Sequence, residues 1–339
     1  MTIYDVARYC GVSKSTVSRV LNNSSGTSEE VRSKVVQAVK ILNYRPHGVA
    51  RGLVLKRSNT VAVVVQDIRN PFYAFASWYA ERCLRKLGYG MVIYNADNDA
   101  TMEKEILELI AYRRADGVLS IGGNRNTTSV VNFHLKEQIP VVVVDREIQG
   151  YEVPTVNLDN RAGGMLATDH LLDLGHERIV FATSDFNLAE LHRKEGYLES
   201  LQLHGYVPDR NLIVTQSEKI WVDGVCHKLV ALLDHKPRPT AVFASNDFKA
   251  IQVISVLRQH GLAIPDDMSV VGYDDIYLAS TVFPGLTTIR QPLELMIEAG
   301  VQLLADIVLG RNPNPQNALF TPELVVRQST KRVLGPSEK

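Results

Sequence analysis

Short runs of β-branched residues alternate with longer stretches of helical periodicity from Asn59 onward, and this alternation restricts the fold more than any other feature. It is typical of parallel sheets whose strands are joined by crossover helices. A fully apolar run such as VVVV at 141–144 indicates a strand that is covered on both faces. We therefore predict an α/β body with strands at 61–65, 91–94, 118–121, 141–144, 179–182, 241–244 and 270–273.

Polar residues follow these strands, in two successive sets. Ligands of open parallel sheets bind beyond the carboxyl ends of the strands. The loops of any α/β protein are polar, but the recurrence in both sets predicts two lobes that line one cleft. Carboxylates, amides and an arginine suit a polyhydroxyl ligand, on whose apolar face Phe72, Tyr73 or Trp221 can stack. The strand-end residues are Asp67, Asn70, Asn95, Asp97, Asn124, Asp145, Arg146, Ser184, Asn246, Asp247, Asp274 and Asp275.

The first 44 residues predict three short helices. Thr2 with Asp5 forms a capping-box pattern before apolar residues at helical spacing. After a Gly-containing turn, Ser13 is placed to cap a second helix. A second capping-box pattern, Thr27 with Glu30, predicts the start of the third helix.

Two helices joined by such a turn form a helix-turn-helix motif, whose second helix presents its first residues to base edges in the major groove. Here those residues are Lys14, Ser15 and Thr16, with Ser18 and Arg19 one turn further on. Their donors and acceptors match those of base edges. A solvated polar face has the same composition, so the motif alone leaves both interpretations open.

The charge distribution favours the DNA-binding interpretation. The formal net charge is zero, but residues 1–57 hold ten Lys and Arg against three Asp and Glu, which gives +7 and leaves −7 for the remainder. A basic head on an acidic body is expected if only the head meets a polyanion.

A short segment after Tyr44 predicts a linker. It contains Pro46 and is too short to form a stable helix by itself, so we expect it to fold only conditionally. Leu53 in this segment is either a wedge that separates base steps in the minor groove or a residue that packs on the body.

The stretch TIYDVARYCGVSKSTVSRVLN, followed by LNYRP and VARGL, resembles the head and hinge of the lactose/galactose repressor (LacI/GalR) family, and the likeness runs through the whole chain. The resemblance implies an N-terminal all-α helix-turn-helix head and a two-lobed, periplasmic-binding-protein-like α/β body of parallel sheets with crossover helices. It implies a repressor that binds a pseudo-palindromic, double-stranded operator as a homodimer and responds to a small-molecule effector. The DNA-contacting positions that it implies, with Leu53 as the intercalating residue, are Thr2, Tyr4, Ser13, Lys14, Ser15, Thr16, Ser18, Arg19, Asn22, Ala50 and Leu53.

The same resemblance implies an effector site between the lobes. Arg193, in the run RKEGY, resembles an arginine that reaches the effector from the second lobe, although a surface ion pair would also explain it. The effector-binding positions are Asn70, Phe72, Asn95, Asp145, Arg146, Arg193, Lys219, Trp221, Asn246 and Asp274.

One position departs from the family pattern. Counting back from Gly224, Lys219 stands where many members carry an aromatic stacking residue, and Trp221 follows two residues later. Either Trp221 supplies the ring, or the effector is anionic, such as a sugar acid or sugar phosphate, or the loop is shifted and Lys219 faces solvent.

The expected domains follow from these assignments. They are a head at 1–45, a hinge at 46–57, a first lobe at 58–160 and 291–320, and a second lobe at 161–290 and 321–339. We expect the chain to cross between the lobes near 158–163, 287–292 and 319–323. The tail shows no apolar heptad, which favours a dimer over a coiled-coil tetramer.

Signatures of catalysis are missing from the sequence. There is no GxxxxGK[ST], GxSxG or HExxH motif, so we predict no enzyme activity, cofactor or metal site. The Gly163–Gly164 pair lacks GxGxxG spacing and is interpreted as a close-packed turn. The scattered cysteines, which we interpret as packing residues, are Cys10, Cys83 and Cys226.

The sequence also predicts a cytoplasmic location. No run approaches the roughly 20 apolar residues of a membrane span, and the first residues lack the pattern of a secretory signal. That start and the basic head argue against a secreted sugar-binding transport protein. Two alternatives stay open for the input: a protein co-regulator, and a non-sugar ligand such as a nucleobase.

Overall fold

The structure is a computed structural model that describes residues 1–21, 25–44, 57–184, 187–215, 227–311 and 316–333. The chain divides into two compact units, residues 1–58 and residues 59–339. Each unit is described by itself.

The small unit is a bundle of three helices, α1 (Ile3–Cys10), α2 (Lys14–Leu21) and α3 (Glu29–Ile41). The Thr2 backbone N–H and hydroxyl both donate to the Asp5 carboxylate, at 2.8 and 2.9 Å, and fix the start of α1 as predicted. The helices enclose one core, formed by Val6, Ala7, Cys10, Val17, Val20, Val35, Ala38 and Tyr44.

The predicted capping box at Thr27 and Glu30 is wrong. The residue that caps α3 is Ser28, whose hydroxyl accepts from the Val31 backbone N–H at 3.4 Å. Two neighbouring hydroxyl residues offer the same capping oxygen, and the helix begins after the second of them.

The large unit contains two six-stranded sheets, one for each lobe. The first sheet is parallel throughout and has the order β11-β5-β4-β3-β1-β2. Its strands are β1 (Thr60–Val65), β2 (Gly90–Asn95), β3 (Gly117–Ile121), β4 (Val141–Val144), β5 (Thr155–Leu158) and β11 (Ala318–Phe320).

The second sheet has the order β12-β10-β9-β8-β6-β7 and is parallel except for β12, which pairs antiparallel with β10. Its strands are β6 (Ile179–Thr183), β7 (Ile213–Thr215), β8 (Ala241–Ala244), β9 (Ser269–Asp274), β10 (Thr287–Arg290) and β12 (Glu323–Val325). The seven predicted strands are all present, whereas the short strands β5, β7, β10, β11 and β12 are absent from the predicted set. The mixed α/β fold predicted from the alternation is therefore confirmed.

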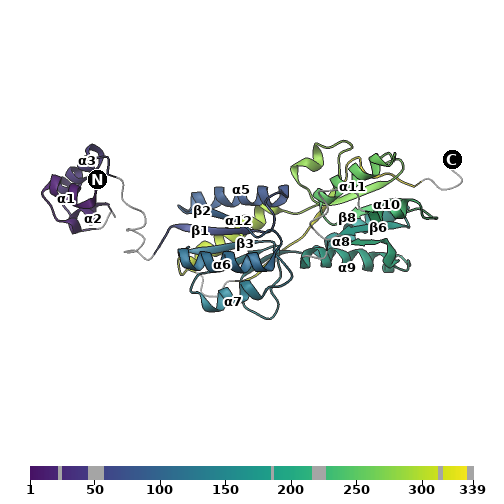
Figure 1. The fold of residues 1–339 in the computed structure, drawn as a ribbon, viewed down its shortest axis with the longest axis horizontal. Helices are drawn as coiled ribbons and strands as arrows, with labels where there is room; N and C mark the ends of the chain where they lie inside the picture. The colour runs from purple at the N-terminus through teal and green to yellow at the C-terminus, as the bar shows by residue number, and fades with distance from the viewer. Residues whose placement is uncertain (22–24, 45–56, 185–186, 216–226, 312–315, 334–339) are drawn as a thin grey trace. The chain divides into compact units, whose positions relative to one another are not determined.

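Helices cover both faces of the first sheet (Figure 1). Val61, Val63 and Val65 of β1 belong to the core beneath α5 (Pro71–Lys86) and α12 (Leu293–Val308). The alternate residues of β1, Ala62 and Val64, belong to the core beneath α6 (Ala100–Arg113) and α7 (Thr128–Lys136). This two-sided burial accounts for the uninterrupted apolar strands.

The second sheet is covered in the same way, by α8 (Asn160–Asp173) and α9 (Leu188–Leu203) on one face and by α10 (His227–Leu233) and α11 (Asp247–Gln259) on the other. The α8–α9 contact is very close: a Cβ at Gly164 would collide with the Arg193 carbonyl, and one at Gly196 with that of Arg161. Gly163 and Gly164 lie within α8, so the prediction of a turn there is wrong, while close packing is what they provide.

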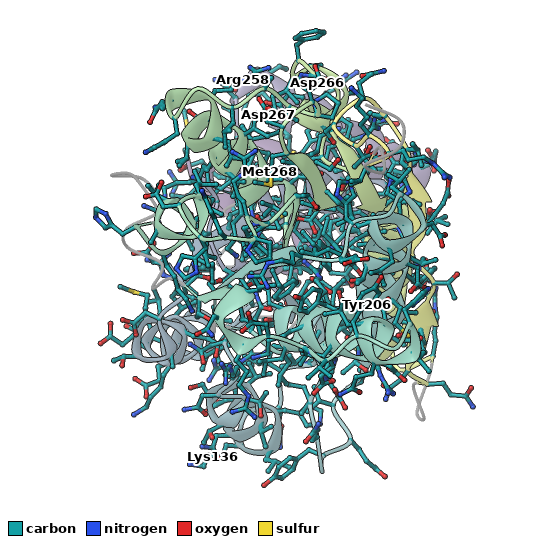
Figure 2. The ribbon with its side chains drawn as sticks, turned by 90° about the vertical axis from the view of Figure 1, so that its right-hand side faces the viewer. Lys136, Tyr206, Arg258, Asp266, Asp267 and Met268 are labelled. Carbon is teal, nitrogen blue, oxygen red and sulfur yellow. The ribbon has the colours of Figure 1, made fainter. Side chains whose placement is uncertain are left out.

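The chain passes between the sheets three times, after β5, after β10 and between β11 and β12. The C-terminal segment then runs along the second lobe, where the Val270 backbone N–H donates to Ser329. On the outer surface of this lobe Asp266 and Asp267 face solvent while the neighbouring Met268 is buried (Figure 2). Within the described residues, no helix is both long and apolar enough to cross a bilayer.

Candidate functional site

The first turn of α2 carries the residues expected to face DNA. The Ser13 hydroxyl accepts from the Thr16 backbone N–H at 3.2 Å and lies 2.7 Å from the Ser15 hydroxyl and 2.9 Å from that of Thr16. Val17 and Val20 of the same helix point into the core. Ser15 and Arg19 are exposed, so α2 presents a polar face to solvent.

Lys14 and Tyr4 connect this face to α1. The Lys14 ammonium lies 5.0 Å from the centre of the Tyr4 ring and 3.4 Å from its hydroxyl. Tyr4 is nevertheless exposed, and so is Thr2 at the start of the same helix. Ser18 is half-buried. The other predicted DNA contacts, Asn22, Ala50 and Leu53, lie outside the described residues.

A cavity of about 380 Å³ lies between the two lobes of the large unit. Six predicted effector residues line it, namely Asn70, Phe72, Asp145, Arg193, Asn246 and Asp274. Its other lining residues are Gln66, Asp67, Arg69, Tyr73, Asp97, Asn98, Ser184, Asn187, Ala189, Glu190, Phe248, Lys249 and Gln252. Lys219 and Trp221 lie outside the described residues, so the choice between them stays open.

Arg193 is buried at the centre of the cavity wall and is held from several sides. Its Nε donates to the Asn160 side chain at 2.8 Å, and its Nη1 donates to the Ser245 carbonyl at 2.7 Å. The guanidinium lies 3.7 Å from the centre of the Tyr273 ring and 3.6 Å from the Asp274 carboxylate. It is therefore fixed before any ligand arrives, and the surface-ion-pair explanation for it is wrong.

Asp145 and Asp274 end strands of opposite lobes, and both have a positive φ, of 56° and 115°. Such backbone conformations are uncommon for residues other than glycine, although Asp adopts them more readily than most. Burial raises the pKa of both carboxyl groups, although Arg193 acts in the opposite direction, and the pKa of Asp274 reaches about 7. The Gln291 amide donates to Asp274 at 2.7 Å, which ties the cavity to a crossing between the lobes.

Three asparagines of the cavity also cap helices. Asn70, Asn187 and Asn246 precede α5, α9 and α11, and the Oδ1 of each accepts a backbone N–H from the first turn of its helix. Their amide nitrogens are the groups suited to a ligand. A capping role and a ligand role are therefore compatible at these positions.

Asn95 and Arg146 are not among the residues that line the cavity. The Asn95 side chain accepts from the Ile68 backbone N–H at 2.8 Å. The Arg146 guanidinium is buried in an ion pair with Glu103, at 2.6 Å, and donates to the Asn126 carbonyl at 2.9 Å. The structure gives both residues internal partners, and Arg146 lines a neighbouring pocket instead of this cavity.

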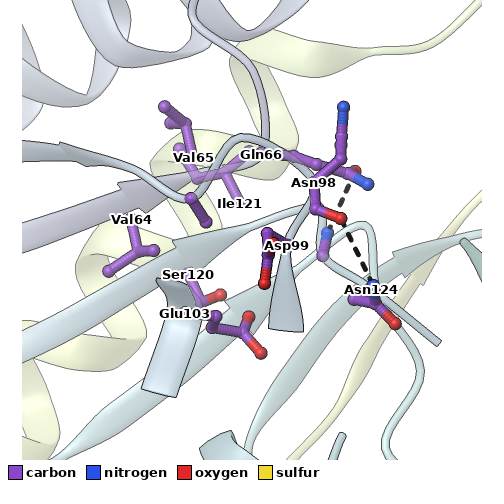
Figure 3. Close-up of a pocket in the computed structure, with 12 residues that line it drawn as sticks. Val64, Val65, Gln66, Asn98, Asp99, Glu103, Ser120, Ile121 and Asn124 are labelled. Carbon is purple, nitrogen blue, oxygen red and sulfur yellow. Dashed lines mark hydrogen bonds between the residues drawn. The ribbon is translucent and has the colours of Figure 1, made fainter. Parts of the chain in front are cut away.

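The remaining strand-end residues have structural partners as well. Asn124 donates to the Asn98 carbonyl at 3.4 Å beside a pocket of only about 10 Å³, which is too small for a sugar (Figure 3). Asp247 accepts from the Thr288 hydroxyl and the Ile276 backbone N–H. Asp275 forms ion pairs with Arg290 and Arg327, at 2.7 and 2.6 Å, and so joins β9, β10 and the segment after β12.

Glu190 and Lys249, neither of which is predicted from the sequence, form a buried ion pair of 2.5 Å in the cavity wall. Lys249 lies three residues after Asn246 and Glu190 three residues before Arg193, so each is about one helical turn from a predicted residue. That spacing is the signal that could have found them. No group of three or more His, Cys, Asp or Glu side chains in the described part of the chain is arranged to hold a metal ion.

Two family models match the chain. Residues 2–47 match the model for bacterial regulatory proteins of the lacI family, and residues 168–330 match that of a periplasmic binding protein-like domain. The first match covers all of α1, α2 and α3, and the second covers most of the second lobe and the segments that return from it.

Known proteins resemble the chain over nearly its full length. The ribose operon repressor of Escherichia coli (strain K12) is 34% identical over 97% of this chain and 99% of its own. A transcriptional regulator CelR–cellobiose complex is 31% identical, with a TM-score of 0.72 over 97% of this chain and 99% of that one. The lac repressor dimer bound to operator and the anti-inducer ONPF has a TM-score of 0.84 at 26% identity and covers 98% of this chain and 99% of its own.

Proposed function

The chain belongs to the lacI family of bacterial regulatory proteins, and from this premise we propose that it is a cytoplasmic repressor that binds a pseudo-palindromic operator as a homodimer and is controlled by a sugar-like effector. That it is a DNA-binding transcription regulator with an effector-binding body follows from the family itself. The observation that carries the proposal is the polar cavity between the lobes, with Arg193 held between Asp145 and Asp274.

The exposed face of α2 supports the DNA-contacting role. Lys14 can donate to guanine O6 or N7, and Ser15 and Thr16 can donate, accept or contact a thymine methyl group. Arg19 is exposed on the same helix and suits a phosphate or base contact. We assign sequence selection to these residues and the bending of the operator to Leu53 as a minor-groove wedge.

An apolar surface of the first lobe supports the dimer. Trp78 of α5 and Val92 and Ile93 of the edge strand β2 are large, apolar and exposed. An exposed edge strand of this composition invites pairing with another chain, and a second copy would cover it. The lac repressor structure that this chain resembles is itself a dimer on its operator.

The chemistry of the cavity supports a polyhydroxyl effector. Carboxylates accept hydrogen bonds from hydroxyl groups, amides and ammonium groups donate to them, and Phe72 and Phe248 offer apolar contact. Related proteins include a ribose operon repressor and a regulator in complex with cellobiose. On this proposal the effector draws Asp145 and Asp274 into one set of hydrogen bonds and so changes the angle between lobes, which alters DNA affinity by linkage.

Replacing Arg193 tests the proposal. Neutral sugars that raise the melting temperature of the purified protein are first identified by thermal shift. DNA affinity is then titrated with and without each such sugar in a gel-shift assay, on duplexes selected from a random pool. Arg193→Ala should abolish the sugar response and leave sugar-free DNA binding unchanged, because Arg193 belongs to the large unit.

Arg161→Ala is the matched control, since Arg161 is an exposed arginine on α8 whose partner is Glu199 and which does not line the cavity. A normal sugar response in Arg193→Ala would show that the effector does not bind in this cavity. A chain that binds no selected duplex more tightly than random DNA would overturn the operator-binding role.

A further inference from the structure

Each cation that lines the described part of the cavity already has a carboxylate partner. Lys249 pairs with Glu190 at 2.5 Å, and Arg193 lies 3.6 Å from Asp274. Arg69 pairs with Asp67 at 2.8 Å and with Asp97 at 3.0 Å. An anionic ligand would therefore have to compete with a protein carboxylate for any of these three groups.

The charge balance of the lining points the same way. Five carboxylates stand against three cations among the described lining residues, which leaves a formal charge of −2. The amino ends of α5, α9 and α11 also meet the cavity at their capping asparagines, and each contributes roughly half a positive charge. With all five carboxylates ionised, as expected above the pKa of about 7 of Asp274, these contributions bring the lining close to neutrality and leave no surplus positive charge for a carboxylate or phosphate.

Lys249 can donate a hydrogen bond to a ligand, while its pair with Glu190 carries no net charge. Its ammonium donates to the Glu190 carboxylate and to the Ser184 hydroxyl, the second at 2.9 Å, and it has one more N–H. The other Glu190 oxygen accepts from the Ser184 backbone N–H, the Ser184 hydroxyl and the Thr183 hydroxyl, at 2.7, 2.8 and 2.9 Å.

Glu190 stays ionised in this position. Burial alone would raise its pKa, but Lys249 and the Ser184 hydrogen bonds lower the pKa to about 2. The Glu190 carboxylate is therefore charged at neutral pH and offsets the charge of the ammonium group that it contacts.

Building on the proposed sugar-like effector, we propose that this effector is an uncharged polyhydroxyl compound and that the Lys249–Glu190 pair makes the cavity reject sugar acids and sugar phosphates. Taking an anion out of water into a buried site costs several kcal/mol unless a cation there is available to it. Hydroxyl groups carry no such cost, because Asp145 and Asp274 accept from them and Lys249 and the asparagine amides donate to them.

Lys219, whose position in the sequence suggests an anionic effector, is not counted in this balance. The segments 185–186 and 216–226 lie outside the described residues. In sequence they contain Asp185, Glu218 and Asp223 against Lys219 alone, so they bring no excess of positive charge.

Matched sets of sugars test the proposal. Binding to the full chain is measured by thermal shift and calorimetry for ribose and ribose 5-phosphate, glucose, glucuronate and glucose 6-phosphate, galactose and galacturonate, and for cellobiose. We expect at least one neutral sugar to bind and its anionic derivatives to bind at least about tenfold more weakly. Inorganic phosphate and sulfate should shift the melting temperature no more than chloride at equal ionic strength.

The possible outcomes distinguish a failure of the anion exclusion from a failure of the proposed sugar effector. An acid or phosphate that binds more tightly than its neutral parent would overturn the exclusion of anions and leave the sugar-responsive cavity standing. Binding by none of the sugars, neutral or anionic, would overturn the sugar effector and the exclusion together.

A charge change within the pair supplies the second test. Glu190→Gln keeps a hydrogen-bonding side chain but leaves the Lys249 charge uncompensated, so the preference for the neutral sugar over its acid should fall by about tenfold. Glu105→Gln removes the same charge from an exposed site on α6 and should leave the preference unchanged. If Glu190→Gln does not fold, Asp67→Asn is measured in its place. It removes one of the two carboxylates paired with Arg69 at the rim of the cavity, so a smaller fall in the preference is expected. An unchanged preference in the folded variant overturns the proposal.

Discussion

The two lobes each bury a carboxylate–cation pair near the end of a sheet, and they use it differently. In the first lobe Glu103 and Arg146 lie 2.6 Å apart, with 4% and 1% of their side-chain surfaces exposed. In the second lobe Glu190 and Lys249 lie 2.5 Å apart, with 5% and 8% exposed. Only the second pair lines the cavity between the lobes. Burial and charge therefore do not by themselves identify a ligand-binding residue; its position relative to the cavity does.

The first-lobe pair should matter most to stability. Glu103→Ala leaves the Arg146 guanidinium buried without its carboxylate, and breaking such a pair from one side costs about 3 to 5 kcal/mol. We expect this loss in the free energy of unfolding, measured by urea denaturation. The Arg146 side chain also occupies the space beside Gly123, where a Cβ atom would collide with it. Arg146 therefore has no room to move in that direction.

Glu105→Ala, on the exposed face of the same helix, is the control and should change the unfolding free energy by no more than about 0.5 kcal/mol. A loss of less than about 1 kcal/mol in Glu103→Ala would mean that water or other groups replace the carboxylate. The contrast between the lobes would then disappear.

The difference between the lobes also shows which features of the site could not be predicted from the sequence. Asp145 and Arg146 are adjacent at the end of β4, and the strand-end pattern predicts both as ligand residues. Adjacent residues at a strand end point in different directions. Which of the two reaches the cavity depends on Glu103, 43 residues earlier in the chain, and no local pattern contains that information.

Local patterns could not predict the Lys249–Glu190 pair either, because its members are 59 residues apart and come from two different helices. The strands and the three head helices, by contrast, follow from local periodicity and capping, and seven strands were predicted for that reason. The short strands β11 and β12 pair only with segments distant in the chain, so local patterns do not reveal them. Six of the predicted effector residues line the cavity, whereas Asn95 and Arg146 do not, and the internal partners were not predicted.

Lys249→Met should cost less than Glu103→Ala, about 2 kcal/mol at neutral pH, because Glu190 keeps its hydrogen bonds to Ser184 and Thr183. The pKa of Glu190, about 2, lies below its ordinary value of 4.5. The pair therefore stabilises the fold above pH 4.5, and this contribution is lost as the pH falls toward 2.

Urea denaturation at pH 5, 4 and 3 measures that loss. The variant should lose less stability over this range than the unmodified protein, since Lys249 no longer lowers the pKa of Glu190. A cost at neutral pH equal to that of Glu103→Ala would show that both pairs serve the fold alike and that the second is not reserved for the cavity.

Asp274→Asn should have the smallest effect, with the opposite dependence on pH. The pKa of Asp274 in the folded protein is about 7, mainly because of burial and against the influence of Arg193, so it lies above the ordinary value of 3.8. Between these values the folded state binds a proton that the unfolded state has released, and stability falls as the pH rises. Asp274→Asn removes this fall, so its stability relative to the unmodified protein should increase by about 1 kcal/mol between pH 6 and pH 7. Unfolding free energies that stay parallel across pH 5 to 8 would instead place an ionised Asp274 beside Arg193 throughout, and both acids of the second-lobe wall would then be permanently charged.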